Sequence, residues 1–310
     1  MKILVTGGAG FIGSNVVDAY IAAGHEVVVV DHAGCKTENV HPKAKLYLVD
    51  IRSAELEHVF AIERPDIVNH HAAQKSVPRS VEDPKLDADI NILGLLNLLE
   101  NSVRHDVQKV IFVSSGGALA GDAAVIPTPE NIEPVMISPY AISKYVSEKY
   151  LYFYFVTHGI RYTSLRYANV YGPRQVPEGE SGVIPIFMNN LLQRRESTLF
   201  AYPDMPKGTT RDYVYVEDVA HANVLALTGG DNQILNIGSG IELYIEDIYH
   251  QMEDVVDIHI PLKHASERVG DVRRSVLDCR LAREVLGWEP RVDLKEGLRR
   301  TYEYYQVHAF

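Results

Sequence analysis

Two tyrosine and lysine pairs with the same spacing lie close together in the sequence, at Tyr140/Lys144 and Tyr145/Lys149. A spacing of four residues places both side chains of a pair on one face of a helix. A cation beside a phenol favours the phenolate, which a tyrosine needs in order to act as a base near neutral pH. The pattern therefore predicts proton transfer and leaves open which pair performs it.

The first pair stands at the start of its predicted helix. Ser138 is a good N-cap and Pro139 suits the first helical position, so Tyr140 and Lys144 fall in the first turns. Five residues of helix rotate Tyr145 by about 140° from Tyr140, so only one pair can face a common site. We predict that Tyr140 and Lys144 are that pair.

The same predicted helix, at 139–158, is unusually aromatic. Its tyrosines and phenylalanines make it too apolar all round for a simple surface helix. These rings could belong to the core or to an interface between two copies of the chain. We expect the second, a homodimer through helices near 86–104 and 139–158.

A hydroxyl partner for the tyrosine is expected where the strand predicted at 109–114 ends. Strand ends open into the ligand cleft of a parallel sheet, so Ser114 or Ser115 can hydrogen-bond a substrate oxygen there. Successive strand side chains point to opposite faces, so only one of the two serines can do so.

The glycines near the N-terminus predict a dinucleotide site. Gly7, Gly10 and Gly13 join an apolar run to an amphipathic stretch, the context in which their spacing is informative. They permit a tight turn and let a pyrophosphate approach the N-terminus of the helix. Asp31 ends the second predicted strand, where a carboxylate accepts ribose hydroxyls and repels a 2'-phosphate. NAD is therefore favoured over NADP.

Apolar runs that alternate with helical periods must position these residues. They predict strands at 2–5, 26–30, 45–49, 67–70, 109–114 and 162–166, with helices near 12–23, 53–62, 86–104 and 139–158. This rhythm predicts an α/β fold with a Rossmann-type doubly wound parallel sheet. We expect an NAD-binding domain at 1–175, to which the chain returns near 212–240. A smaller, irregular C-terminal substrate lobe is expected at 176–310.

Composition argues against several classes of protein. The 310 residues hold 30 Lys and Arg against 41 Asp and Glu, a net charge of -11, without a long basic run. Nucleic acid and anionic membranes are therefore unfavourable partners. Only two cysteines occur and no apolar stretch approaches membrane-spanning length, so we expect a cytoplasmic protein. The 13 histidines lack metal-ligand spacings, and no metal site is expected.

Motifs along nearly the whole chain resemble the extended short-chain dehydrogenases/reductases, and within them the nucleotide-sugar epimerases of the UDP-glucose 4-epimerase type. The motifs are the glycine loop, Asp31, His70 to Ala73, Asn91, the loop after Ser115, the Tyr140/Lys144 pair, 165–174, 211–216, 236–238 and 268–271. The resemblance implies that NAD is the cofactor and that Ser115, Tyr140 and Lys144 are catalytic.

The resemblance also implies two sets of ligand-binding residues. For the cofactor these are Gly7, Gly10, Phe11, Ile12, Gly13, Asp31, His32, Asp50, Ile51, Ala72, Ala73, Asn91, Ser114, Tyr140, Lys144 and Tyr167. For the substrate they are Ser115, Asn169, Arg211, Arg268, Asp271 and Ser275. The chain departs from the pattern at Ala120, where such enzymes usually carry tyrosine, and at His32, where they carry asparagine.

The activity implied by the resemblance is an isomerisation, the 4-epimerisation of a UDP-sugar through a transient 4-keto sugar with tightly bound NAD. The small side chains of Ser275 and Ala120 predict a relaxed UDP-glucose/UDP-galactose enzyme that tolerates N-acetylated sugars. A UDP-uronic acid 4-epimerase, another nucleotide-sugar dehydratase or reductase, and a non-catalytic NAD-binding scaffold are the alternatives. A dehydratase would need an Asp-Glu acid/base pair where Gly116 and Gly117 stand.

Overall fold

A seven-stranded parallel sheet forms the centre of the computed structural model, which describes residues 1–177, 182–267 and 271–308. Its strand order is β11-β6-β5-β4-β1-β2-β3, and every neighbouring pair is parallel. The strands are β1 (Lys2–Thr6), β2 (Glu26–Asp31), β3 (Lys45–Leu48), β4 (Ile67–His70), β5 (Lys109–Ser115), β6 (Arg161–Tyr167) and β11 (Gln233–Ile237). The predicted doubly wound sheet is therefore confirmed.

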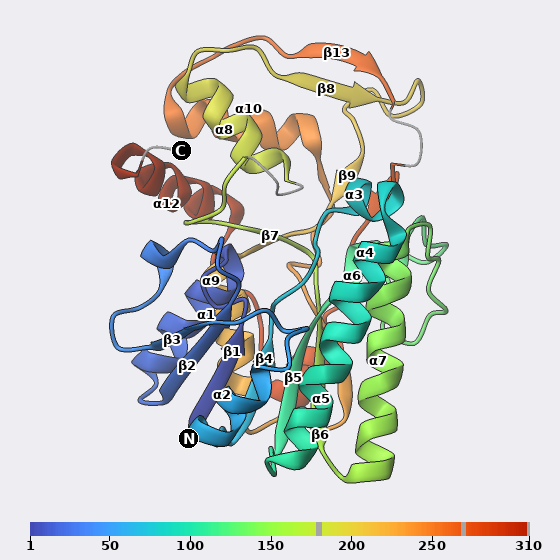
Figure 1. Ribbon diagram of the computed structural model, residues 1–310. Helices are drawn as coiled ribbons and strands as arrows, with labels where there is room; N and C mark the ends of the chain where they lie inside the picture. Colours follow the sequence, from blue (N-terminus) through green and yellow to red (C-terminus); the bar gives the residue numbers. More distant parts are fainter. Residues whose placement is uncertain (178–181, 268–270, 309–310) are drawn as a thin grey trace.

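Helices cover both faces of the sheet (Figure 1). One layer consists of α1 (Phe11–Ala22), α9 (Val216–Ala226) and α11 (Arg280–Leu286), and the other of α2 (Leu56–Glu63), α5 (Gly94–Arg104) and α7 (Pro139–His158). Because strand side chains alternate, Ile3 and Val5 pack in the first layer and Leu4 in the second. No helix within the described ranges is long and apolar enough to cross a membrane.

The helix predicted near 86–104 is interrupted in the structure. It consists of α4 (Pro84–Ala88), a π-helical turn η2 (Asp89–Leu93) and α5. The sequence also did not predict two short helices, α3 (Val77–Glu82) and α6 (Gly116–Ala120), because so short a segment shows no hydrophobic period. Their N-caps are Ser76 and Ser115, whose side chains accept hydrogen bonds from Arg79 and Ala118 amides.

A smaller lobe lies beyond the carboxyl ends of the strands, at the top of Figure 1. Its elements are β7 (Asn169–Tyr171), α8 (Val183–Leu192), β8 (Thr198–Ala201), β9 (Thr210–Arg211), β10 (Tyr213–Tyr215), β12 (Leu243–Tyr244), α10 (Ile245–Val256), β13 (Lys263–Ser266), β14 (Arg274–Ser275) and α12 (Leu294–Val307), with a 3-10 turn η1 (Thr37–Asn39) on the sheet side. A separate core that includes Phe187, Tyr249 and Leu298 stabilises it. Between α9 and α10, β11 joins the central sheet beside β6.

Candidate active site

A cleft of about 970 Å³ lies where the carboxyl ends of the strands meet the lobe. Its walls come from the β1–α1 turn, the ends of β2, β4 and β5, the start of α7 and the 167–176 segment. Ile184 and Tyr213 contribute from the lobe. Open α/β sheets bind ligands at this edge, because the strand ends there carry the polar loops.

The turn between β1 and α1 leaves no room for a side chain at Gly7 or Gly13. Gly7 has a φ of +69°, and a Cβ on it would lie 2.7 Å from the Ala72 nitrogen. A Cβ on Gly13 would lie 2.2 Å from the Gly7 oxygen, so the helix packs directly on the turn. The first amides of α1 thus remain close to the cleft, where a diphosphate can accept their hydrogen bonds.

Asp31 is buried at the end of β2 and lines the cleft. Its Oδ2 accepts a hydrogen bond from the Ala9 amide at 3.0 Å, and its Oδ1 accepts one from the His32 amide at 2.9 Å. These bonds fix the carboxylate beside the glycine turn and leave lone pairs for ribose hydroxyls. The His32 ring is largely exposed and accepts a hydrogen bond from the Gly34 amide.

Tyr140 and Lys144 both line the cleft, one turn apart on α7. The Ser138 side chain caps the helix by accepting a hydrogen bond from the Ala141 amide at 3.2 Å. The Lys144 ammonium donates to the Val113 carbonyl at 2.8 Å and lies 5.8 Å from the centroid of the Tyr140 ring. The cap and this anchor bring the pair to the end of β5.

Burial dominates the electrostatics of the pair. It raises the pKa of Tyr140 to about 12, against a hydrogen bond with Ser115 that lowers it. Burial also lowers the pKa of Lys144 to about 8, against the charges of Asp87 and Glu148, which raise it. A charged Lys144 beside the phenol favours the phenolate, so the two groups together can accept and return a proton.

The second tyrosine and lysine pair lies on another face of α7. The Lys149 ammonium sits 4.5 Å from the centroid of the Tyr145 ring, and neither side chain lines the cleft. Identical spacing therefore gives two different environments on one helix, as the rotation between Tyr140 and Tyr145 requires.

Ser114 and Ser115 end β5, and both line the cleft. Ser115 interacts with Tyr140 and caps α6, its Oγ accepting the Ala118 amide at 3.4 Å. The buried Ser114 Oγ has no hydrogen-bond partner among the described residues. Ser115 is thus the serine beside the proposed base, and Ser114 has capacity for a ligand.

Most of the predicted ligand-binding residues line the cleft. Besides those already described, they are Gly10, Phe11, Ile12, Asp50, Ile51, Ala73, Tyr167 and Asn169. Asn91 is buried outside the lining and holds the chain after β4 by two hydrogen bonds with the Gln74 backbone, each 2.9 Å long.

The predicted substrate residues of the lobe lie apart from the cleft lining. The Arg211 guanidinium pairs with Asp271 at 2.7 Å, and Ser275 is buried on β14. A Cβ on Gly117 would lie 3.2 Å from the Ser275 hydroxyl, which places Ser275 beside the turn that follows Ser115. Arg268 lies outside the described residues.

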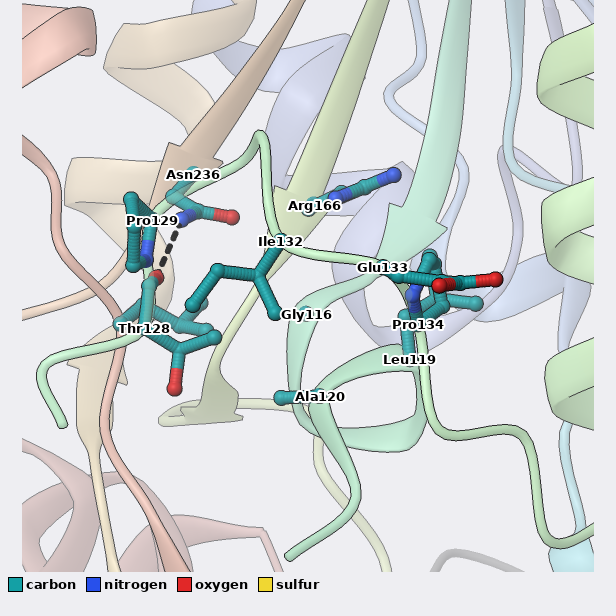
Figure 2. Close-up of a pocket in the computed structure, with 11 residues that line it drawn as sticks. Gly116, Leu119, Ala120, Thr128, Pro129, Ile132, Glu133, Pro134, Arg166 and Asn236 are labelled. Atoms are coloured by element: carbon teal, nitrogen blue, oxygen red, sulfur yellow. Dashed lines mark hydrogen bonds between the residues drawn. The ribbon is translucent and has the colours of Figure 1, made fainter. Parts of the chain in front are cut away.

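Ala120 lines a small pocket separate from the cleft (Figure 2). Arg166 and Asn236 share this pocket, and the Asn236 side-chain amide donates to the Thr128 carbonyl at 3.0 Å. The absence of a large ring at this position therefore adds no volume to the cleft, contrary to the expectation from the sequence.

Several cleft residues were not assigned a role from the sequence. They are Cys35, Lys36, His71, Gln74, Lys75, Arg79 and Arg174. His71, Gln74 and Lys75 come directly after β4, and Ser115 stands at the corresponding end of β5. Their place after a predicted strand could therefore have indicated that they line the cleft. Arg174 has a φ of +72° and pairs with Asp18 of α1 at 2.7 Å, features that only the fold reveals.

These features fit a bound dinucleotide. Gly7 and Gly13 accept no Cβ, Asp31 is fixed beside the glycine turn, and the unpartnered Ser114 hydroxyl lines the same cleft as Lys144. Among the described residues, no cluster of three His, Cys, Asp or Glu could hold a metal ion. The fold and the site thus define a dinucleotide-dependent enzyme of the short-chain dehydrogenase/reductase class.

Comparison with known proteins gives the family. A model of the NAD dependent epimerase/dehydratase family matches residues 3–238, and the chain belongs to this family. NAD is accordingly its cofactor, as the sequence predicted.

Similar proteins cover nearly the full chain. The UDP-glucose 4-epimerase of Mycolicibacterium smegmatis is 40% identical over 99% of this chain and 99% of its own. A Thermotoga maritima UDP-glucose 4-epimerase solved with UDP-glucose has 47% identity, 99% coverage of both chains and a TM-score of 0.95. A Methanobrevibacter ruminantium UDP-N-acetylglucosamine 4-epimerase, in complex with UDP-N-acetylmuramic acid, has 32% identity and a TM-score of 0.92 and covers 99% of this chain and 98% of its own.

Proposed function

We propose that the protein is a UDP-sugar 4-epimerase acting on UDP-glucose and UDP-galactose. The observation that carries this proposal is the convergence of Ser115, Tyr140 and Lys144 at the nicotinamide-binding edge expected for this fold. The similar proteins described above support the choice of substrate class. Gly116 and Gly117 after Ser115 disfavour a dehydratase, because neither can protonate a leaving hydroxyl.

The residues of the cleft would share the proton transfer. The Tyr140 phenolate accepts the proton of the sugar 4-hydroxyl, Ser115 hydrogen-bonds the same oxygen, and the Lys144 ammonium stabilises the phenolate. The glycine turn and Asp31 would hold NAD, which would supply the hydride acceptor and donor for C4. The resulting 4-keto sugar turns about its diphosphate linkage, and Tyr140 returns the proton when hydride is delivered to the opposite face.

A panel of UDP-sugars incubated with the holoenzyme tests this function. We expect UDP-glucose and UDP-galactose to interconvert without added cofactor, because each turnover regenerates NAD. Chromatographic separation of the epimers gives the measurement. A dehydrated product, a preference for uronic acids, or no turnover despite bound NAD would each contradict the proposal.

We further propose that the enzyme tolerates the N-acetylated UDP-hexoses. Ser275 lies outside the cleft lining but beside Gly117 in the turn after Ser115, and it supports this proposal because a small side chain there permits that turn to yield to a larger substituent. The UDP-N-acetylglucosamine 4-epimerase among the similar structures adds support. A small side chain permits the larger substrate without making it the preferred one.

We also propose a homodimer through α5 and α7. Large apolar side chains are exposed at the end of η2, directly before α5, and along α7: Leu93 on η2, and Ile142, Tyr152, Phe153 and Val156 on α7. Those of α7 recur at helical spacing along one side, which suits a second copy of the same surface. Light scattering of the Phe153→Glu variant tests the proposal: we expect monomers, whereas an unchanged mass would contradict the interface.

A further inference from the structure

Asp87 on α4 is a carboxylate with 0% exposure that is hydrogen-bonded to α7, the helix of Tyr140 and Lys144. Its Oδ1 accepts hydrogen bonds from the side-chain amides of Gln74 and Asn91 at 2.9 and 3.0 Å. Its Oδ2 is 2.6 Å from the Ser143 hydroxyl, one residue before Lys144 on α7. The Asp87 carboxylate thus links three segments by hydrogen bonds: the loop after β4, the turn η2 and the helix α7.

The two amides are oriented by backbone groups and not by Asp87. The Asn91 side chain accepts from the Gln74 amide and donates to the Gln74 carbonyl, each at 2.9 Å. The Gln74 side chain accepts from the Ser76 amide at 2.7 Å and donates to the Ser76 carbonyl at 2.9 Å. Both amides therefore present N–H groups to one oxygen of Asp87, the arrangement that suits an ionised carboxylate.

No cation among the described residues donates a hydrogen bond to Asp87. Glu148, the other carboxylate that acts on Lys144, is paired with Arg166 at 2.7 Å. Arg166 offsets the charge of Glu148, whereas no arginine of the described ranges pairs with Asp87. A buried charge needs a compensating partner, and Lys144 is the cation on which Asp87 acts.

The remaining titratable groups around Lys144 do not provide negative charge. Burial lowers the pKa of His70 and of His71 to about 3, so both rings are neutral near pH 7. Burial raises the pKa of Tyr140, and its phenol is neutral until Lys144 favours the phenolate. Burial by itself would lower the pKa of Lys144 further, because the value of about 8 already includes the raising effects of Asp87 and Glu148.

We propose that Asp87 is a positioning residue for the proposed epimerase reaction: its buried charge keeps the Lys144 ammonium protonated, and its hydrogen bond with Ser143 holds the turn of α7 that carries Lys144. The role of Asp87 in catalysis rests on the proposed function. Its effect on the protonation of Lys144 is independent of that function, because this protonation is a property of the holoenzyme without substrate.

Direct titration of Lys144 tests the proposal. In holoenzyme labelled with carbon-13 at the lysine ε-carbon, the Lys144 signal is assigned by its loss in Lys144→Arg and followed from about pH 6 to about pH 10. In Asp87→Asn we expect the midpoint at lower pH. At about pH 9 the protonated fraction should fall roughly tenfold if the midpoint moves by one pH unit. An unchanged midpoint, with kcat reduced equally at every pH, overturns the proposal.

Two further variants separate charge from structure. Ser143→Ala keeps the carboxylate and deletes its hydrogen bond, so it should lower kcat at every pH while the Lys144 midpoint stays near that of the wild type. The double variant Asp87→Asn/Ser143→Asp returns one carboxylate to the network and should restore the midpoint of the Lys144 titration. It also tests the proposal if Asp87→Asn alone does not fold. A low midpoint in either variant would overturn the proposal. Failure of the UDP-sugar panel leaves these titrations unaffected.

Discussion

The sheet domain and the lobe contribute differently to the site. Residues at the ends of strands, such as Asp31 and Ser115, line the cleft together with the start of α7. Predicted substrate residues of the lobe, Arg211, Asp271 and Ser275, lie beside or behind it. A parallel sheet brings distant strand ends to one edge by its topology, whereas a lobe of short strands places each residue individually. We therefore propose that residues of the sheet domain carry the chemistry and that residues of the lobe bind the UDP-sugar.

Tyr140→Phe should have the largest effect. Removal of the proposed base should lower kcat at least about 100-fold, within the usual contribution of general acid/base catalysis. Tyr145→Phe, on the other face of the same helix, is the matched control and should change kcat little. Steady-state kinetics with UDP-galactose give the comparison. Reversed effects would show that the sheet edge does not position the base.

Asp31 should determine cofactor choice. Calorimetry on cofactor-stripped protein should show NAD binding at least about tenfold tighter than NADP, because the fixed carboxylate repels a 2'-phosphate. Asp31→Ser should narrow this difference. Equal or tighter binding of NADP by the wild type would remove the sheet domain's role in choosing the cofactor.

Arg211→Met tests the lobe. Loss of this guanidinium should raise KM for the UDP-sugar about tenfold, the scale of one hydrogen-bonded charge, while kcat changes little. Arg280→Met is the control, since its largely exposed guanidinium pairs with Asp278 on the surface. A fall in kcat with KM unchanged would contradict the proposal that residues of the lobe act in substrate binding and not in the chemical step.

Ser275→Tyr should have the smallest effect. The added ring should lower activity on UDP-N-acetylgalactosamine relative to UDP-galactose by several-fold, on the order of 1 kcal/mol for a pocket contact. Both substrates are assayed with the same preparation, so partial misfolding cancels in the ratio. An unchanged ratio would place Ser275 outside the sugar-binding region.

Much of the sheet domain was predictable because its signals are local. The apolar runs, the glycine turn and the Ser138 cap each depend on residues within one or two turns of chain. The interruption at η2 was missed because a π-helical turn has no distinct hydrophobic period. The short helices α3 and α6, of 6 and 5 residues, were missed because so short a segment shows no hydrophobic period.

By itself, the sequence determined the doubly wound sheet, the dinucleotide-binding turn and the helical phase that separates Tyr140 from Tyr145. These follow from backbone geometry and periodicity, which act over short distances. Only the tertiary structure decided that Asp87 bonds to Ser143 on α7, that Arg211 pairs with Asp271, and that Ala120 lines a separate pocket. Such contacts depend on how elements distant in the chain pack together, and no local pattern of residues specifies that packing.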